Sequence, residues 1–260
     1  MTGVNKTLYI PLYGKAYVSK RNIILSDSYA EKIWDKNGFK LKAKSRSRWL
    51  AYYMGMRARV FDDWVSAELN DVDNVTVIHI GCGLDSRAMR VGVSAHRWYD
   101  VDFPEVIEER RRHFIESDSY KMISGDILEE GWLEAIPTDR KIILVMEGVS
   151  MYLSPDELSD FVLRMCQRFE RISLLMDCYT VFAAKASKYK NPINDVGVTR
   201  VYGIDEPRFL EKSGVKYIGE HNMTPDHLID QLSGMEKSIF SKVYGGKMSK
   251  KLYKLYEYSK

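Results

Sequence analysis

The chain has 260 residues, of which 45% are hydrophobic and 29% charged. This composition indicates one large globular domain and excludes disordered, collagen-like and disulfide-framework proteins. The net charge of +3, from 39 basic and 36 acidic residues, is too small to favour nucleic acid or an anionic membrane as a partner.

Neither a membrane span nor a secretory signal is expected. No apolar run reaches about 18 residues, and the N-terminal stretch has no continuous apolar segment. The three cysteines, Cys82, Cys166 and Cys178, form no CxxC pair and have no metal-ligand spacing. We therefore expect a cytoplasmic protein with reduced thiols and no bound metal, and the sequence does not indicate its oligomeric state.

The first segment, residues 1–70, is expected to form a helical N-terminal cap or lid. Apolar side chains recur there every three or four positions, at Trp49, Tyr52, Tyr53, Met56, Val60 and Trp64. That spacing predicts a helix with one buried face.

The remainder, residues 71–260, is expected to form the core domain. Short apolar runs predict strands over residues 75–80, 97–103, 121–124, 141–146 and 172–176. A charged helix is expected at 104–115, where Arg110 to Arg112 indicate a solvated face. Ser154 and Pro155 predict the start of another helix. Strands that alternate with helices form a parallel sheet covered on both faces.

Near the C-terminus, two last strands are expected at 215–218 and 252–258, joined through a helix at 226–243. Residues 180–214 fit neither a strand nor a helix pattern cleanly. Two interpretations of this insertion stay open: a lid over a binding site, or an ordered surface excursion.

A pair of glycines follows the first predicted strand. Gly81 and Gly83 would let the backbone approach a ligand closely, although a GxG pair alone is a weak signal. A dinucleotide-binding fingerprint would place a glycine at position 86, where this chain has Ser86. Asp85 would also lie beside a pyrophosphate, which is unfavourable. Both residues favour a cofactor without phosphates.

Acidic residues follow the later strands. Asp102 lies about twenty residues beyond the glycines, where nucleotide-binding sheets hold ribose hydroxyls. Asp126 follows the third strand, at the level of an adenine, and Glu147 ends the fourth. Any one of these is more often a turn or capping residue. Together, at the carboxyl ends of successive strands, they predict a ligand crevice.

Four motifs, in order, resemble a known family. VIHIGCGLDSRAMR (residues 77–90), WYDVDFPEVIEERRR (98–112), SGDIL (124–128) and EGVSMYLSPDEL (147–158) resemble the leucine carboxyl methyltransferase family, in particular its bacterial polyketide O-methyltransferase branch. The resemblance runs from about residue 6 to residue 207. It implies an S-adenosyl-L-methionine-dependent methyltransferase with the class I, Rossmann-like α/β fold, whose seven-stranded sheet has an antiparallel last strand.

The same resemblance implies cofactor roles for eight residues. They are Lys15 and Arg57 (methionine carboxylate), Gly81 and Gly83 (backbone under the cofactor), Asp102 (ribose), Asp126 and Ile127 (adenine), and Glu147 (methionine amino group). A zwitterion in a closed crevice needs partners of both charges, so the assignment is physically reasonable.

Methyl transfer from a sulfonium is an in-line displacement that depends mainly on positioning. A carboxylate acceptor is already ionised at neutral pH, whereas a hydroxyl acceptor needs a general base. No histidine has a convincing catalytic spacing, and His79 in the first strand is interpreted as structural. Tyr152 and Tyr202 are predicted to face the acceptor, with packing an equal alternative for Tyr152. The catalytic residues stay unassigned.

The combined hypothesis is an O-methyltransferase for a small-molecule acceptor such as a polyketide, with a carboxyl group favoured and S-adenosyl-L-homocysteine as product. Two alternatives stay open. One is a non-catalytic S-adenosylmethionine-binding regulatory protein, and the other is a nicotinamide-dependent reductase, which Ser86 and Asp85 disfavour.

Overall fold

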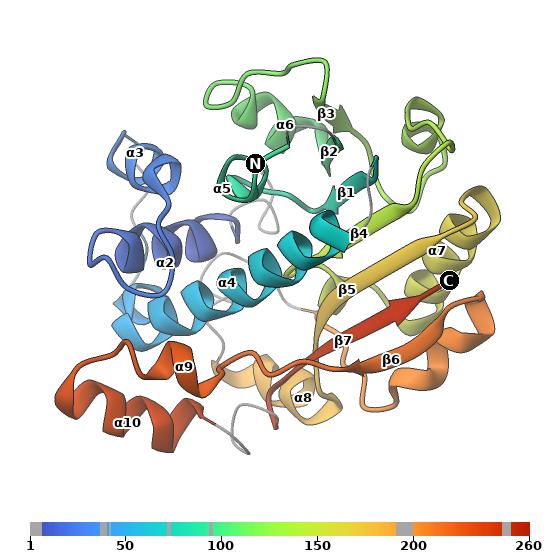
Figure 1. Ribbon diagram of the computed structural model, residues 1–260. Helices are drawn as coiled ribbons and strands as arrows, with labels where there is room; N and C mark the ends of the chain where they lie inside the picture. Colours follow the sequence, from blue (N-terminus) through green and yellow to red (C-terminus); the bar gives the residue numbers. More distant parts are fainter. Residues whose placement is uncertain are drawn as a thin grey trace.

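A computed structural model shows the architecture and describes residues 7–36, 41, 43–71, 74–93, 96–190, 200–245 and 251–260. Its centre is a seven-stranded sheet of order β3-β2-β1-β4-β5-β7-β6 (Figure 1). The strands are β1 (Thr76–Ile80), β2 (Arg97–Asp102), β3 (Tyr120–Ser124), β4 (Ile142–Met146), β5 (Ile172–Tyr179), β6 (Lys216–Glu220) and β7 (Tyr253–Ser259). Strands β1 to β5 are parallel, and β7 is antiparallel to both of its neighbours. The predicted α/β sheet with an antiparallel last strand is confirmed.

Helices precede the sheet and connect its strands. They are α2 (Tyr9–Ser19), α3 (Ser28–Lys36), α4 (Arg48–Asp71), α5 (Arg87–Val91), α6 (Pro104–Arg110), α7 (Pro155–Arg168), α8 (Val181–Lys190), α9 (Asp226–Ile229) and α10 (Gly234–Tyr244). Short 3-10 helices are η1 (Ala43–Arg46), η2 (Gly131–Ala135), η3 (Ser150–Tyr152) and η5 (Pro207–Ser213). The N-terminal segment contains α2, α3 and α4.

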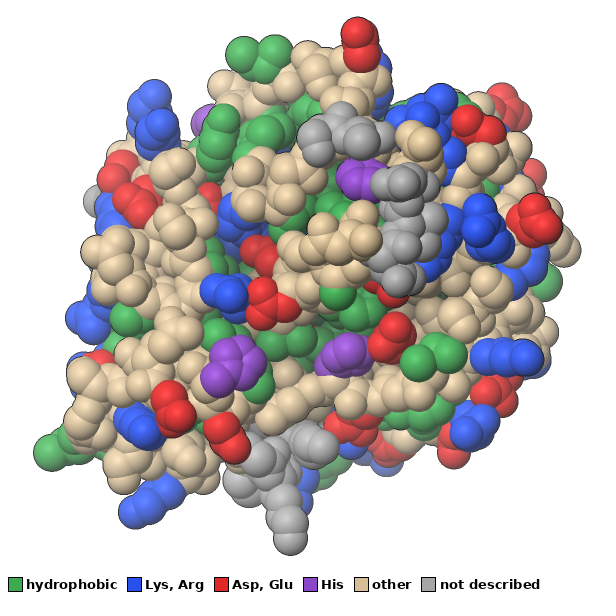
Figure 2. All heavy atoms as spheres, viewed as in Figure 1, with side chains coloured by type: hydrophobic (Ala, Val, Ile, Leu, Met, Phe, Trp, Pro, Cys, Tyr) green, Lys and Arg blue, Asp and Glu red, His purple; other side chains and the backbone are tan. Residues whose placement is uncertain are grey.

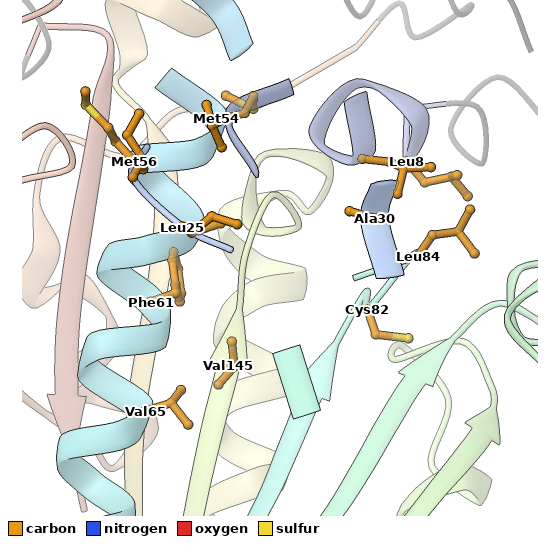
Figure 3. Close-up of a cluster of buried hydrophobic side chains, with 14 of the residues drawn as sticks. Leu8, Leu25, Ala30, Met54, Met56, Phe61, Val65, Cys82, Leu84 and Val145 are labelled. Atoms are coloured by element: carbon orange, nitrogen blue, oxygen red, sulfur yellow. The ribbon is translucent and has the colours of Figure 1, made fainter. Parts of the chain in front are cut away.

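Each face of the sheet has its own hydrophobic core, because successive side chains of a strand point to opposite faces. In β4, Ile143 and Val145 join the core under the N-terminal helices, whereas Ile142 and Leu144 join the core under α7. Figure 3 shows Phe61 of α4 and Val145 of β4, which belong to the same core. Both faces of the parallel strands are therefore covered.

The long helix α4 differs from the prediction of one buried face. Every residue from Ala51 to Ala58 is buried, including Gly55 and Arg57. Helix α4 packs against α2 and also contacts β4, and Tyr52 meets Phe240 of α10 at 6.1 Å between ring centroids. The segment from Ala51 to Ala58 is enclosed on all sides, whereas Asp63 and Asn70 later in the helix are exposed. The apolar periodicity predicted the helix but not this enclosure.

Three other boundaries differ from the sequence predictions. Strand β5 continues to Tyr179, because Asp177 to Tyr179 pair with β7. The helix expected at 226–243 is two helices, and α10 begins at Gly234, which has a left-handed φ of +47°. In the segment 180–214, residues 181–190 form α8, and residues 191–199 lie outside the described residues.

Candidate active site

The chain passes from β1 into α5 through a tight turn at Gly81 and Gly83, whose φ angles are +61° and +51°. A Cβ on Gly81 would lie 2.3 Å from Cγ2 of Val149, in the loop after β4. A side chain at this position would therefore displace the Val149 side chain. In the sheet, β1 has β2 on one side and β4 on the other, so the strand order reverses direction beside this turn. Ligand crevices in open α/β sheets usually lie at such a point.

Asp102 is held rigidly at the end of β2. Its two carboxylate oxygens accept hydrogen bonds from the backbone N–H groups of Gly83 and Phe103, both at 2.8 Å. Burial nevertheless raises the pKa of Asp102 to about 6, because the backbone donors and Arg110 offset only part of the desolvation.

Arg57 of α4 reaches the ends of two strands. Its Nε donates to Oε1 of Glu147 at 2.9 Å, and its Nη1 donates to Oδ2 of Asp177 at 3.0 Å. Arg87 donates to the second oxygen of Glu147. Burial would raise the pKa of Glu147, but the guanidinium groups of Arg57 and Arg87 outweigh it and hold the pKa well below its ordinary value. Glu147 is therefore a buried, ionised carboxylate.

Lys15 of α2 lies beside the glycine turn through a second buried pair. Its Nζ is 3.0 Å from Oδ2 of Asp85, and Nη1 of Arg90 donates to Oδ1 of Asp85 at 2.8 Å. These cations lower the pKa of Asp85 against the effect of burial. Because the charge of Asp85 is compensated, it does not by itself argue against a phosphate-containing cofactor, and that argument rests on Ser86 alone.

Ser86 and His79 have structural partners. The Ser86 hydroxyl donates to Asp27 at 2.6 Å. Nε2 of His79 faces the Arg87 guanidinium at 3.1 Å, so Nε2 accepts and the proton is on Nδ1, 3.3 Å from Asp100. Burial lowers the pKa of His79, which keeps the ring neutral. Its geometry agrees with the structural interpretation.

A cavity of about 830 Å³ connects these groups. All eight residues with implied cofactor roles line it, as does Tyr152; Tyr202 is not among the described lining residues. Asp126 is half-buried, and its Oδ1 accepts from the N–H of Leu128 at 2.9 Å. Ile127 is partly buried against the core under α7. The ring of Tyr202 instead packs under the guanidinium of Arg200, 5.0 Å from its centroid.

The cavity continues into a tyrosine-rich part. Tyr179 lies 4.5 Å from Tyr253 between ring centroids, Tyr253 lies 5.7 Å from Tyr53, and Tyr53 lies 6.2 Å from Tyr244. These four rings come from β5, β7, α4 and α10 and all line the cavity. Among the described lining residues, the only cations are Lys15 and Arg57. The cavity thus combines a strongly charged part with an uncharged aromatic part.

The sequence profile of the leucine carboxyl methyltransferase family matches residues 11–165, more than half of the chain. The chain belongs to the leucine carboxyl methyltransferase family. It is therefore an S-adenosyl-L-methionine-dependent O-methyltransferase.

Individual relatives agree with this family. The tetracenomycin polyketide synthesis O-methyltransferase TcmP of Streptomyces glaucescens is 28% identical over 92% of this chain and 90% of its own length. The S-adenosyl-L-methionine-dependent methyltransferase dpfgK of Gibberella zeae is 28% identical over 84% of this chain and 81% of its own length. The solved structure of magnesium protoporphyrin IX methyltransferase from Synechocystis PCC 6803 with bound SAH has a TM-score of 0.54 at 11% identity, over 90% of this chain and 94% of that one. The last comparison shows the class I fold alone.

Sequence reasoning missed the buried charged residues of this methyltransferase that contact the cavity-lining groups without lining the cavity themselves. Arg110, expected on a solvated face, is fully buried, pairs with Asp100 and donates from Nη1 to the Gly83 carbonyl at 3.0 Å. Arg87 and Asp177 are likewise fully buried. One signal was available: a charge inside an apolar strand, as at Asp100 and Asp177, must have a buried partner.

Two further observations concern cofactors and membranes. In the described part of the chain, no group of three or more His, Cys, Asp or Glu side chains is arranged to hold a metal ion. None of the described helices is long and apolar enough to cross a bilayer. On the face shown in Figure 2, acidic and basic side chains are interspersed.

Proposed function

We propose that this methyltransferase methylates the carboxylate of a small, largely apolar acceptor. One observation carries the proposal: a single cavity joins a charged part, suited to the zwitterionic end of the cofactor, to an aromatic part whose described lining residues include no histidine and no carboxylate. The polyketide-related name of the relative TcmP supports an acceptor of this class.

The charged part suits S-adenosylmethionine, which supplies an electrophilic methyl group when bound. Arg57 and Lys15 would hold the methionine carboxylate, and Glu147 would accept hydrogen bonds from the amino group. Asp102 would accept from the ribose hydroxyls, while Asp126 and Ile127 would frame the adenine. The positive φ angles at Gly81 and Gly83 shape the turn whose backbone would pass beneath the ligand, and the missing Cβ lets Gly81 fit beside Val149.

The aromatic part suits an apolar acceptor. Its tyrosine rings offer wide apolar faces, and their hydroxyl groups offer hydrogen bonds for orientation. His79 is neutral and engaged with Arg87. Burial raises the pKa of Tyr152 and of Tyr253, so neither is a ready base. An acceptor that is already ionised needs only alignment and exclusion of water.

The proposal also gives covering roles to two segments, a lid and an N-terminal cap. Ala183, Ala186 and Ser187 of α8 line the cavity, which supports the interpretation of residues 180–214 as a lid. Ile10, Pro11 and Lys15 of α2 line it as well, which supports residues 1–70 as a cap over the core at residues 71–260. Both segments would close over the acceptor.

The first test is calorimetric binding of S-adenosylmethionine and S-adenosylhomocysteine, with NADH and NADPH as controls. We expect micromolar affinity for the adenosyl ligands alone, about −8 kcal/mol. Matched pairs of an aromatic carboxylic acid and the corresponding phenol then test the acceptor, and methyl transfer to the acid alone is expected. Transfer to the phenol alone would contradict the carboxyl proposal. Preference for a nicotinamide would contradict the cofactor roles.

A further inference from the structure

Asp177 is a buried charge that none of the implied cofactor roles includes. It lies near the carboxyl end of β5, in a strand whose residues are all buried, and its own exposure is 0%. It is not among the residues that line the cavity. Because burying an unpaired carboxylate is costly, its partners indicate what it does.

These partners belong to two different parts of the site. Oδ2 of Asp177 accepts from Arg57, which lines the charged part of the cavity. Oδ1 accepts from the backbone N–H of Gly148 at 2.6 Å, and the Asp177 carbonyl accepts from the Ser150 hydroxyl. Gly148 has a φ of +74° and leads into η3, which carries Tyr152.

The guanidinium of Arg57 is held by two acids at different nitrogens, Nε by Glu147 and Nη1 by Asp177. Without the second acid, Glu147 would be its sole described carboxylate partner, and the guanidinium could turn fully onto Glu147. Both groups would then be less available to a zwitterionic ligand.

We propose that Asp177 is a positioning residue that holds Arg57 towards the cofactor carboxylate and fixes the 148–152 turn beside the acceptor. This inference rests on the proposed cofactor roles. One side chain thereby sets the spacing between the two reactants, which is the main requirement of an in-line displacement.

The variant Asp177→Asn separates the contact with Arg57 from the contact with the 148–152 turn. An asparagine keeps an oxygen for the Gly148 N–H but loses the charge that holds Arg57. We expect S-adenosylhomocysteine to bind about tenfold to a hundredfold more weakly by calorimetry. Ser150→Ala touches the turn alone, so kcat should fall while the ligand affinity stays within twofold.

The control is Glu257→Gln on the adjacent strand β7. Glu257 forms a half-buried pair with His221, in which the Glu257 oxygen and the His221 nitrogen are 2.6 Å apart, and neither residue lines the cavity. The substitution removes the charge of this pair. It should leave ligand affinity unchanged. Equal weakening in Asp177→Asn and Glu257→Gln would overturn the proposal, because it would indicate a general loss of packing. Unchanged affinity in Asp177→Asn would overturn it as well.

A measurement on the unaltered protein covers the case in which Asp177→Asn does not fold. Binding of S-adenosylhomocysteine should slow amide hydrogen exchange at residues 176–178 of β5, which do not line the cavity, since the ligand would immobilise Arg57 and, through it, Asp177. Exchange unchanged on binding would contradict the coupling. Failure of the unaltered protein to bind the ligand would instead contradict the proposed cofactor roles.

Discussion

Asp102 and its surroundings give a residue-level view of how the site controls ionisation. Two backbone N–H groups donate to this carboxylate, and Arg110 lies nearby, yet burial raises its pKa to about 6. The ligand-free protein therefore begins to protonate Asp102 just below neutral pH. A ribose would be held by the ionised form, since both of its hydroxyl groups donate to an acceptor.

The affinity for S-adenosylhomocysteine should therefore depend on pH. The folded-state pKa of about 6 lies above the ordinary value, so the proton stabilises the ligand-free fold as pH falls below 6 and must be released on binding. Affinity should fall about tenfold per pH unit below that point. Calorimetry between pH 5 and 7.5 measures this, with Asp102→Asn as a control that should bind weakly and show a flat profile. A slope retained in Asp102→Asn would assign the titration to another group.

Neighbouring arginines show why residue roles are hard to infer from sequence. Arg110 is fully buried and pairs with Asp100, whereas Arg112, two positions later, is largely exposed and pairs with Glu109 at 2.9 Å. Both occur in the same charged run. Which one turns inward depends on the position of α6 over the sheet, and local composition does not contain this information.

At the scale of elements, the turn between β1 and α5 has the strongest steric requirement. Gly81 combines a left-handed φ with a contact that a Cβ would close to 2.3 Å. Gly92, at the end of α5, has a φ of +83° and nothing within 4 Å of a built Cβ. The two glycines therefore differ in steric contact while sharing a positive φ.

Alanine substitution should separate these effects. Gly92→Ala should lower the free energy of unfolding by about 1–3 kcal/mol, because its φ of +83° and ψ of 147° lie in a region that only glycine readily adopts. Gly81→Ala should cost about 1–3 kcal/mol more, because the Val149 side chain must move. It should also abolish ligand binding, which Gly92→Ala should retain. Urea unfolding and calorimetry measure both quantities, and equal losses would refute the steric account of the turn.

The strands and most helices were predictable, because each is a local pattern. The capping box at the start of α7 is an example: Ser154 Oγ accepts from the Glu157 N–H, and the Glu157 carboxylate accepts from the Ser154 N–H. Helix α4 was predicted, but the burial of every residue from Ala51 to Ala58 was not. Its neighbours come from distant parts of the chain, and they decide which of its faces are buried.

At the scale of the whole molecule, the cavity is built from both ends of the chain. Lining residues come from helices α2, α8 and α10, from the carboxyl ends of the parallel strands, and from β7. The N-terminal helices share one hydrophobic core with Val77, Ile143 and Leu255 of the sheet. A ligand in the cavity should therefore stabilise the N-terminal helices and the sheet together.

Saturating S-adenosylhomocysteine should raise the melting temperature. At a hundredfold excess over Kd, the stabilisation is about 2.7 kcal/mol, which corresponds to roughly 5–10 °C for a chain of this size. Hydrogen exchange should slow in α2 and α4 as well as at residues 81–86. Differential scanning calorimetry and exchange mass spectrometry measure these effects, with NADH as a control that should change neither. Protection confined to residues 81–86 would contradict a cap that closes over the cofactor.

The sequence by itself determined the sheet class, the antiparallel last strand expected from the family resemblance, and the residues that line the charged part of the cavity. The sheet class and the residues Gly81, Gly83, Asp102, Asp126 and Glu147 depend on local patterns: β-branched runs, glycines at turns and acids at strand ends. The antiparallel last strand and the roles of Lys15, Arg57 and Ile127 came from the resemblance to the family. The tertiary structure alone decided which charges are buried behind the wall, as at Arg87, Arg110 and Asp177. It also decided that tyrosines from four separate elements meet in one cavity. Burial and pairing are relations between distant segments, and they exist only once the sheet has brought those segments together.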